Sequence, residues 1–310
     1  MTGPGLGLGI WGVPVAVLGG ALRVSTPFLF VSLGECVTER SGRVNLGLEG
    51  TLVMGAMAGY ATSVLTGSPW LGVAAAGAVG VAFGALHGWL CSLPRVNDVA
   101  IGIALMLLGV GLAFFLGKPF IQPVAPHLPS ISLGGWSDSP PLRAALEVNV
   151  LFVVGFALAF ALRFALTRTR WGMIIRVVGE SAPAARAIGY DVNRVRTLAT
   201  VAGGCLAGIG GCFLSLGYPG SWNEGLSSGQ GLMAVALVIF ARWQPLRCLW
   251  VSLLFGGASA LGTALQAVGV TSGYYLFSIA PYVLTLAIMI ATSSARRTLP
   301  GQPGELTVAR

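Results

Sequence analysis

Long apolar stretches separated by short polar breaks dominate the pattern of this sequence. A helix needs about 20 apolar residues to cross the hydrocarbon core of a bilayer, and nine stretches approach or meet that length. They lie near residues 10–36, 46–66, 70–91, 99–117, 148–167, 197–217, 230–241, 248–268 and 273–293. The seventh is too short to cross alone, which favours a half-helix preceded by a re-entrant segment. The pattern predicts an all-α fold, a polytopic transmembrane helical bundle of about 8–10 spans that allows for broken or re-entrant helices.

Arginines concentrate in alternate breaks of this pattern, above all between residues 163 and 196 and in the C-terminal tail. Positively charged loops face the cytoplasm, and this assignment satisfies alternation along the chain with the N-terminus outside. The predicted organisation is a transmembrane permease domain over residues 1–298, with a cytoplasmic loop at 168–196 and an irregular external loop at 118–147. Residues 299–310 are expected to form a disordered cytoplasmic tail.

Composition agrees with this class. Hydrophobic residues make up 55% of the 310 positions, charged residues make up 9%, and mean hydropathy is +0.82. A soluble domain carries roughly a quarter charged residues, so most of this surface faces lipid. The net charge of +8 lies in the breaks between spans, which excludes a basic face for nucleic acid. The N-terminus lacks the basic region of a cleavable signal peptide.

Catalytic and metal-binding patterns are absent from the sequence. It contains no phosphate-binding loop, and Lys118 is its only lysine. The five cysteines form no C-x-x-C pair and are predicted to be small buried hydrophobes. We therefore expect no metal and no cofactor bound by this chain, and an enzyme is disfavoured. If ATP drives the protein, another polypeptide must hydrolyse it.

Glycines recur at a spacing of four in two of the apolar stretches. Gly80, Gly84 and Gly88 form one row, and Gly204 and Gly208 form a second row that Cys212 continues. Small residues at this spacing lie on one helix face and let two membrane helices approach closely. Both rows are predicted to be helix-packing faces.

Residues 179–192, GESAPAARAIGYDV, predict a short helix inside the arginine-rich loop. Ser181 is a suitable N-cap, Pro183 suits the first turn, and Gly189 can take the left-handed conformation that ends a helix. Its small alanines would let it sit deep in a groove of a partner. An ordinary surface helix between spans explains the pattern equally well.

Residues 39–50, ERSGRVNLGLEG, place polar groups and three glycines between two apolar stretches. Asn45 and Glu49 would face a passing solute if the helix is broken here, as transporters often arrange. The alternative is a cytoplasmic turn whose arginines only set topology. That alternative fits Arg40 and Arg43 better than it fits Asn45 and Glu49.

Residues 218–231, YPGSWNEGLSSGQG, combine an aromatic ring with hydrogen-bonding groups. An aromatic plane beside amides suits a sugar or a base, which singles out Trp222, Asn223 and Gln230. An interfacial Trp in an external loop is the alternative.

Four segments, in this order, resemble the permease subunits of bacterial ABC importers for nucleosides and simple sugars. They are ERSGRVNLGLEG, GESAPAARAIGYDVNRVR with LAGIGGCFLSLG, GLMAVALVIFARWQPL and APYVLTL. The resemblance covers about residues 20–295, and the broader family includes ribose and branched-chain amino acid permeases. The form SGRVNLGLEG is more similar to the nucleoside branch. Met106 stands where nucleoside-type permeases often carry Asn, which is a departure in the substrate pathway.

The resemblance implies a permease subunit in a bacterial inner (plasma) membrane with several partners. These would be a cytoplasmic ABC ATPase subunit that uses the ATP, a second permease subunit, identical or homologous, and an external solute-binding lipoprotein. The ATPase would dock on the coupling helix near Glu180, Ser181, Ala184, Ala185, Arg186 and Gly189. The substrate pathway would involve Asn45, Glu49, Asn97, Met106, Trp222, Asn223 and Gln230, although Asn97 also suits a helix cap.

The solute expected from the resemblance is a nucleoside, with a simple sugar such as ribose or galactose as the alternative. A self-sufficient secondary transporter is a third hypothesis. Ion coupling usually needs ionisable groups inside the spans, and the spans read from this sequence are nearly free of them.

Overall fold

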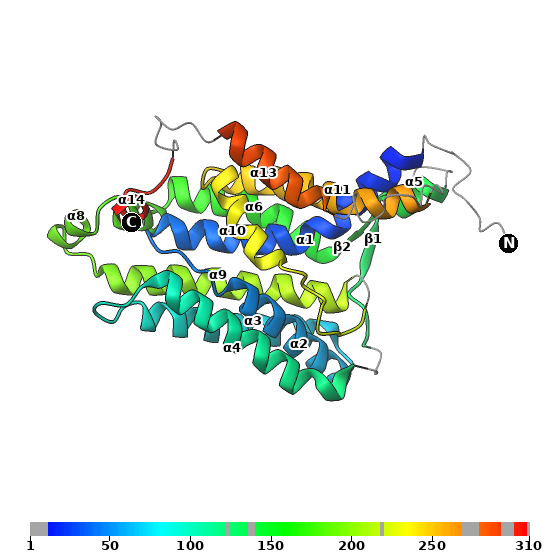
Figure 1. Cartoon of the computed structure of the whole chain (residues 1–310), viewed down its shortest axis with the longest axis horizontal. Helices are drawn as coiled ribbons and strands as arrows, with labels where there is room; N and C mark the ends of the chain where they lie inside the picture. The colour runs from blue at the N-terminus through cyan, green and yellow to red at the C-terminus, as the bar shows by residue number, and fades with distance from the viewer. Residues whose placement is uncertain are drawn as a thin grey trace.

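The computed structural model describes residues 12–121, 125–135, 140–217, 220–267, 279–292 and 301–308. Helices dominate these residues, in agreement with the predicted all-α bundle (Figure 1). The longer helices are α1 (Gly12–Arg40), α2 (Leu48–Thr66), α3 (Pro69–Leu90), α4 (Asp98–Gly117), α6 (Val150–Arg168), α7 (Arg170–Glu180), α9 (Val192–Leu216), α10 (Gln230–Phe240), α11 (Pro245–Ala267) and α13 (Ala280–Thr292). The shorter elements are η2 (Lys118–Phe120), β1 (Ser130–Ser132), α5 (Pro140–Ala145), β2 (Glu147–Asn149), α8 (Ala182–Ala187) and α14 (Glu305–Val308).

Six of the described helices are long and apolar enough to cross a membrane. They are Val13–Arg40, Pro69–Leu90, Asp98–Phe120, Val150–Arg168, Val192–Leu216 and Pro245–Gln266. The seventh predicted stretch is α10, which has 11 residues and is too short to span. Residues 273–278 and 293 of the ninth predicted stretch lie outside the described residues.

Helix α9 lies at the centre of the bundle, where it packs against α1, α2 and α3. Figure 1 shows α8 and α14 at one end of the bundle and α5, β1 and β2 at the other. The arginine-rich loop and the long 118–147 loop therefore lie at opposite ends.

Both glycine rows are helix-packing faces, as predicted, and the structure shows that they pack against each other between α3 and α9. A Cβ added at Gly84 would lie 2.5 Å from the carbonyl oxygen of Thr200, and one added at Gly80 would meet the carbonyl oxygen of Gly204. A Cβ added at Gly208 would meet the carbonyl oxygen of Ala76. The two backbones are thus in direct contact, with no room for a side chain between them.

Replacing Gly80 with leucine should prevent this contact and lower the stability of the bundle by about 3 kcal/mol, the upper range for overpacking a core. Thermal unfolding of the purified protein in detergent measures the effect. Gly111→Leu on α4 is the matched control, because a Cβ there meets nothing within 4 Å. Equal unfolding temperatures for the two variants would contradict the packing assignment.

Three regions differ from the sequence expectations. The 118–147 loop is not wholly irregular, because β1 and β2 form an antiparallel pair with Ser130 opposite Asn149 and Ser132 opposite Glu147. The arginine-rich loop contains α7, an amphipathic helix that the sequence analysis missed.

The C-terminal tail is the third difference. Residues 301–308 belong to the segment for which we expected disorder, and in the structure they end in α14. The physical reason is a set of long-range contacts: Glu305 bonds with Ala182 and Arg196, and Leu306 packs against a buried apolar cluster.

Candidate functional site

The helix predicted in the arginine-rich loop is α8, and it begins and ends at the residues that the sequence indicated. Ser181 is the N-cap, and its Oγ accepts a hydrogen bond from the backbone N–H of Ala184 at 3.3 Å. Pro183 lies in the first turn. Gly189 has a φ of +89°, a conformation that glycine adopts at low cost. The local sequence therefore determines where α8 begins and ends.

Helix α8 has one buried and one exposed face. Ala182 and Ala185 are buried in a small apolar cluster with Val178, Val192 and Val195. The exposed face carries Pro183, Ala184, Arg186 and Ala187, and it continues through Ile188 and Gly189. Glu180 is also exposed, just before the N-cap.

The exposed face of α8 is mostly small and apolar. Ile188 is 62% exposed beside it, at an end of the bundle otherwise rich in arginine. Exposed apolar surface of this kind marks contact surfaces between proteins when it forms a patch. The two alanines predicted for docking therefore differ in exposure. Ala184 is available to a partner, whereas Ala185 is buried and packs the helix against the bundle.

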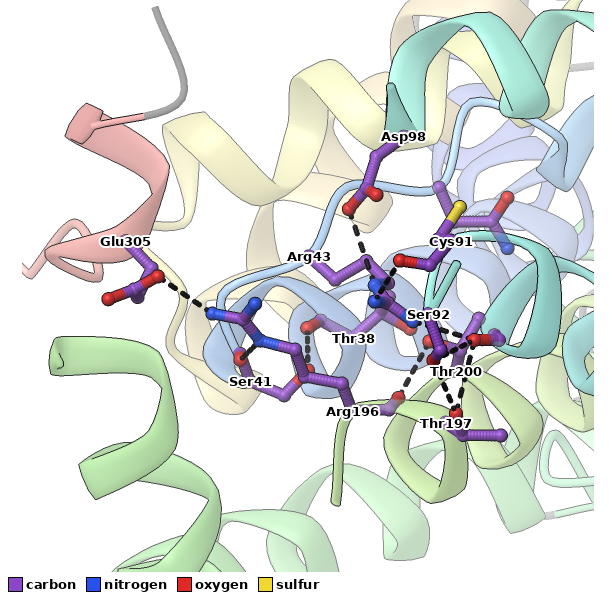
Figure 2. A network of polar contacts seen from close by, with 12 residues as sticks. Thr38, Ser41, Arg43, Cys91, Ser92, Asp98, Arg196, Thr197, Thr200 and Glu305 are labelled. Atoms are coloured by element: carbon purple, nitrogen blue, oxygen red, sulfur yellow. Dashed lines mark hydrogen bonds and ion pairs between the residues drawn. The ribbon is translucent and has the colours of Figure 1, made fainter. Parts of the chain in front are cut away.

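A buried polar network lies beneath this end of the bundle (Figure 2). Arg43 donates from Nη1 to the carbonyl oxygen of Gly88 at 2.9 Å and from Nη2 to that of Cys91 at 2.8 Å. Its Nε lies 3.3 Å from Oδ2 of Asp98. Arg43 therefore joins the end of α3 to the beginning of α4, a structural role beyond setting topology.

The electrostatics of Arg43 follow from its burial. Its side chain is 3% exposed, and burial lowers the pKa of the guanidinium while the carboxylate of Asp98 raises it. The carboxylate of Asp98 beside it favours the charged form of the guanidinium. Removing its partner would leave a buried charge without compensation.

A second arginine in the network connects three elements. Arg196 donates from Nε to the carbonyl oxygen of Ser41 at 3.1 Å, and its Nη2 pairs with Oε2 of Glu305 at 2.9 Å. Ser41 directly follows α1, Arg196 lies in the first turns of α9, and Glu305 begins α14.

Between the two arginines lies a cavity of about 420 Å³. Its lining residues are Gly42, Arg43, Val44, Cys91, Val96, Asn97, Asp98, Val99, Arg196, Glu305 and Leu306. Asn97 is exposed here and caps α4, because its Oδ1 accepts from the backbone N–H groups of Val99 and Ala100 at 2.8 and 3.1 Å. This position is at the α8 end of the bundle.

Glu49 occupies a different place, at the beginning of the half-helix α10. Its side chain is buried. Oε1 accepts from the Ser227 hydroxyl at 2.6 Å and from the Gly229 backbone N–H at 3.2 Å, while Oε2 accepts from the Gly231 N–H at 2.6 Å. A carboxylate at free backbone N–H groups is a favourable helix cap. Glu49 thus fixes α10 to α2.

Asn45 is buried, and its side chain bonds within its own turn. Its Oδ1 accepts from the Gly47 N–H at 2.9 Å, and its backbone N–H donates to Oε1 of Glu35 at 2.8 Å. The structure therefore places the Asn45 amide oxygen in a local turn, whereas Glu49 reaches a distant element.

The residues predicted around an aromatic ring are not brought together. Trp222 is 1% exposed and lies in the apolar core, where its indole reaches the backbone of Gly117. Asn223 is exposed, and its Oδ1 accepts from the Gly225 N–H at 3.1 Å. The buried ring of Trp222 cannot offer its face to a solute in this conformation.

Gln230 lies at the first position of α10 and lines a cavity of about 220 Å³. Arg23, Pro27 and Phe213 line the same cavity. The side-chain Oε1 of Gln230 is buried and has no hydrogen-bond partner among the described residues. Of the predicted pathway residues, Gln230 and Glu49 are the two that meet at one place, the beginning of α10.

Met106 lies on α4 against α2. A Cβ added at Gly50 would lie 2.6 Å from the Met106 carbonyl oxygen, so the backbones of α2 and α4 touch there. This contact is made by the backbone of Met106. An asparagine, which nucleoside-type permeases often carry here, could make the same backbone contact.

Two carboxylates in α1 are buried: Glu35 was not singled out from the sequence, and Glu39 was expected in the polar segment between two apolar stretches. Glu35 and Glu39 are 0% and 2% exposed, and the Glu39 carboxylate accepts a hydrogen bond from Nε1 of Trp243. Because α1 continues to Arg40, the span is less free of ionisable groups than the sequence suggested. Their spacing of four residues, which puts both on one helix face, was the available signal.

The cysteines behave as the sequence predicts. Cys36, Cys91, Cys212 and Cys248 are buried and Cys205 is half-buried. Burial raises the pKa of the Cys91 thiol to about 12, which leaves it protonated and unreactive at neutral pH. Within the described residues no cluster of three or more His, Cys, Asp or Glu side chains is arranged to hold a metal ion.

Comparison with known proteins adds to this geometry. Residues 17–293 match the family described as the branched-chain amino acid transport system permease component. A putative glucose ABC transporter permease protein of Haloferax volcanii, TsgC13, is 32% identical, and the match covers 92% of this chain and 94% of the relative. The guanosine ABC transporter permease protein NupQ of Bacillus subtilis is 30% identical, with 86% and 88% covered. The nucleoside ABC transporter permease protein NupC of Lactococcus lactis is 29% identical, with 88% and 90% covered.

Proposed function

The chain belongs to the family of the branched-chain amino acid transport permease component and is a membrane-embedded permease subunit of an ABC importer, and we propose that the solute it carries is a nucleoside. The observation that carries this choice is that two of its relatives, at 30% and 29% identity over most of their length, are permeases for guanosine and for nucleosides. The nucleoside-like form of the segment SGRVNLGLEG supports the same choice.

The permease itself is not catalytic, and ABC importers work with an ATPase and a solute-binding protein. We propose that the ATPase docks on the exposed face of α8, where Pro183, Ala184 and Ala187 are small enough to permit close contact. A second permease subunit would complete the translocation pathway, and an external lipoprotein would deliver the solute.

We place the solute pathway near the beginning of α10. Two features support this: the half-helix is anchored by Glu49, and the adjoining cavity is lined by Gln230. Discontinuous helices commonly form substrate sites in transporters. Asn45, Met106, Trp222 and Asn223 have weaker support as contact residues, because their side chains or backbones serve turns and packing.

A simple sugar is the second candidate, and one observation favours it. The relative described as a putative glucose ABC transporter permease is 32% identical over 92% of this chain.

Solute binding to the partner lipoprotein separates the two candidates. A ligand at 100 times its Kd stabilises a protein by about 2.7 kcal/mol, which raises the unfolding temperature of a domain by about 5 to 10 °C. We expect guanosine or another nucleoside to produce this shift and glucose to produce none. Uptake of the same solutes into proteoliposomes that contain the whole importer and internal ATP is the second measurement. A shift and uptake with glucose alone would contradict the nucleoside proposal.

A further inference from the structure

We propose that Glu305 is a positioning residue for the coupling between ATP hydrolysis and transport, because it fastens α8 to the end of α1 through Arg196. The inference rests on the proposed docking of the ATPase at α8. Glu305 lies in the C-terminal segment, residues 299–310, for which the sequence alone predicted a disordered tail.

The Glu305 carboxylate holds two partners at once. Oε1 accepts from the backbone N–H of Ala182, the first residue of α8, at 2.7 Å. Oε2 pairs with Nη2 of Arg196 at 2.9 Å (Figure 2). One side chain therefore connects α8 with α9, over separations of 123 and 109 residues.

Arg196 carries the connection onward to α1. Its Nε donates to the Ser41 carbonyl oxygen, one residue beyond the end of α1. Figure 2 shows the Arg196 side chain lying between Ser41 and Glu305. The chain of contacts from α8 to α1 thus consists of three hydrogen-bonded steps through two charged side chains.

The segments joined by these hydrogen bonds are also in close backbone contact. A Cβ added at Gly42, whose φ is +83°, would lie 2.8 Å from Cβ of Glu305. A Cβ added at Gly304 would meet the carbonyl oxygen of Glu180, and one added at Gly179 would meet that of Arg40. The ends of α1 and α7 and the residue before α14 are therefore packed directly on one another, so that a displacement of α8 cannot be absorbed by loose side chains.

The surroundings of the ion pair distinguish it from an ordinary surface pair. The side chains of Arg196 and Glu305 are 15% and 22% exposed, whereas those of Arg194 and Asp191, on the same loop, are 85% and 52% exposed. Exposed pairs contribute little and are screened by salt. Arg194 lies two residues from Arg196, which makes it a matched control for the loss of one arginine at the start of α9.

The test uses the complete importer in proteoliposomes, with the permease, ATPase, second permease subunit and loaded binding protein. The measured quantity is the number of solute molecules imported per ATP hydrolysed, with guanosine or glucose, whichever the wild-type importer carries. In Glu305→Ala and Arg196→Ala this ratio should fall at least about fivefold, the lower end of usual coupling between sites. Glu305→Gln keeps an acceptor for the Ala182 N–H but loses the charge, so a smaller loss is expected. Arg194→Ala should keep the wild-type ratio.

Hydrogen exchange of the Ala182–Ala187 amides in the same assemblies gives a second readout. Faster exchange in Glu305→Ala than in Arg194→Ala is expected, because α8 loses its fastening. A wild-type ratio in Glu305→Ala and Arg196→Ala would overturn the inference. So would failure of Glu305→Ala, Glu305→Gln and Arg196→Ala alike to assemble, since the residue would then serve folding alone. If the wild-type importer neither hydrolyses ATP nor imports either solute, the proposed function itself fails, and the inference falls with it.

Discussion

An arginine in place of Ala184 should abolish solute uptake while the permease still folds and enters the membrane. Ala184 is exposed on α8, and its side chain is small enough for a partner to contact the helix closely. A bulky charge buried there on docking of the ATPase would cost several kcal/mol, and a cost of about 3 kcal/mol weakens the contact roughly 150-fold. Uptake into proteoliposomes and ATP hydrolysis stimulated by the loaded binding protein measure the effect.

Two neighbouring substitutions serve as controls for Ala184→Arg. Ala184→Ser keeps a small side chain and should transport normally. Ala185→Arg changes a fully buried position in the apolar cluster beneath α8, so it should lower the yield of folded permease instead of acting on coupling alone. Normal uptake and normal stimulated hydrolysis in Ala184→Arg would show that α8 is not the docking helix.

Replacing Glu49 with alanine should displace the beginning of α10 and reduce uptake by roughly 150-fold, if the loss is about 3 kcal/mol. The substitution removes the acceptor for the Ser227 hydroxyl and for the N–H groups of Gly229 and Gly231. Charge-assisted hydrogen bonds of this kind contribute about 1.5–3 kcal/mol each. Initial rates of uptake, normalised to the amount of assembled importer, measure the change.

Further variants separate this role from a general loss of charge. Glu49→Gln retains one acceptor oxygen and should be less impaired than Glu49→Ala. Gly231→Ala should impair uptake without changing any charge, because a Cβ there would lie 2.6 Å from Cα of Glu49. Glu224→Ala removes an exposed carboxylate from the preceding segment and should remain near wild type. Unimpaired uptake in Glu49→Ala would exclude an anchoring role for the carboxylate.

Features that depend on local pattern were predictable from the sequence. The apolar stretches gave the helices, because spanning length and hydropathy are properties of a short window. The ends of α8 followed from Ser181, Pro183 and Gly189, whose backbone preferences act locally. The glycine spacing predicted that α3 and α9 would each have a face for close helix packing. It did not predict that Gly80 would pair with Gly204.

Features that depend on distant partners were not predictable. Nothing local in the C-terminal segment indicates that Glu305 meets Ala182 and Arg196, more than 100 residues away. The burial of Trp222 likewise depends on the close approach of Gly117 from α4. Helix α7 was missed because its arginines resembled a loop, although its apolar residues recur at helical spacing.

The backbone contact between α3 and α9 has a consequence for how the two ends of the permease communicate. Because the backbones of α3 and α9 touch at Gly80, Gly84 and Gly208, we expect the two helices to tilt together as one rigid unit. Helix α9 has 25 residues, a length of about 37 Å at 1.5 Å per residue. It begins near Arg196 and ends at Leu216, whose carbonyl oxygen accepts a hydrogen bond from the Leu128 N–H, two residues before β1. We therefore expect a tilt imposed at the Arg196 end of α9 to displace the segment before β1 at the other end of the bundle.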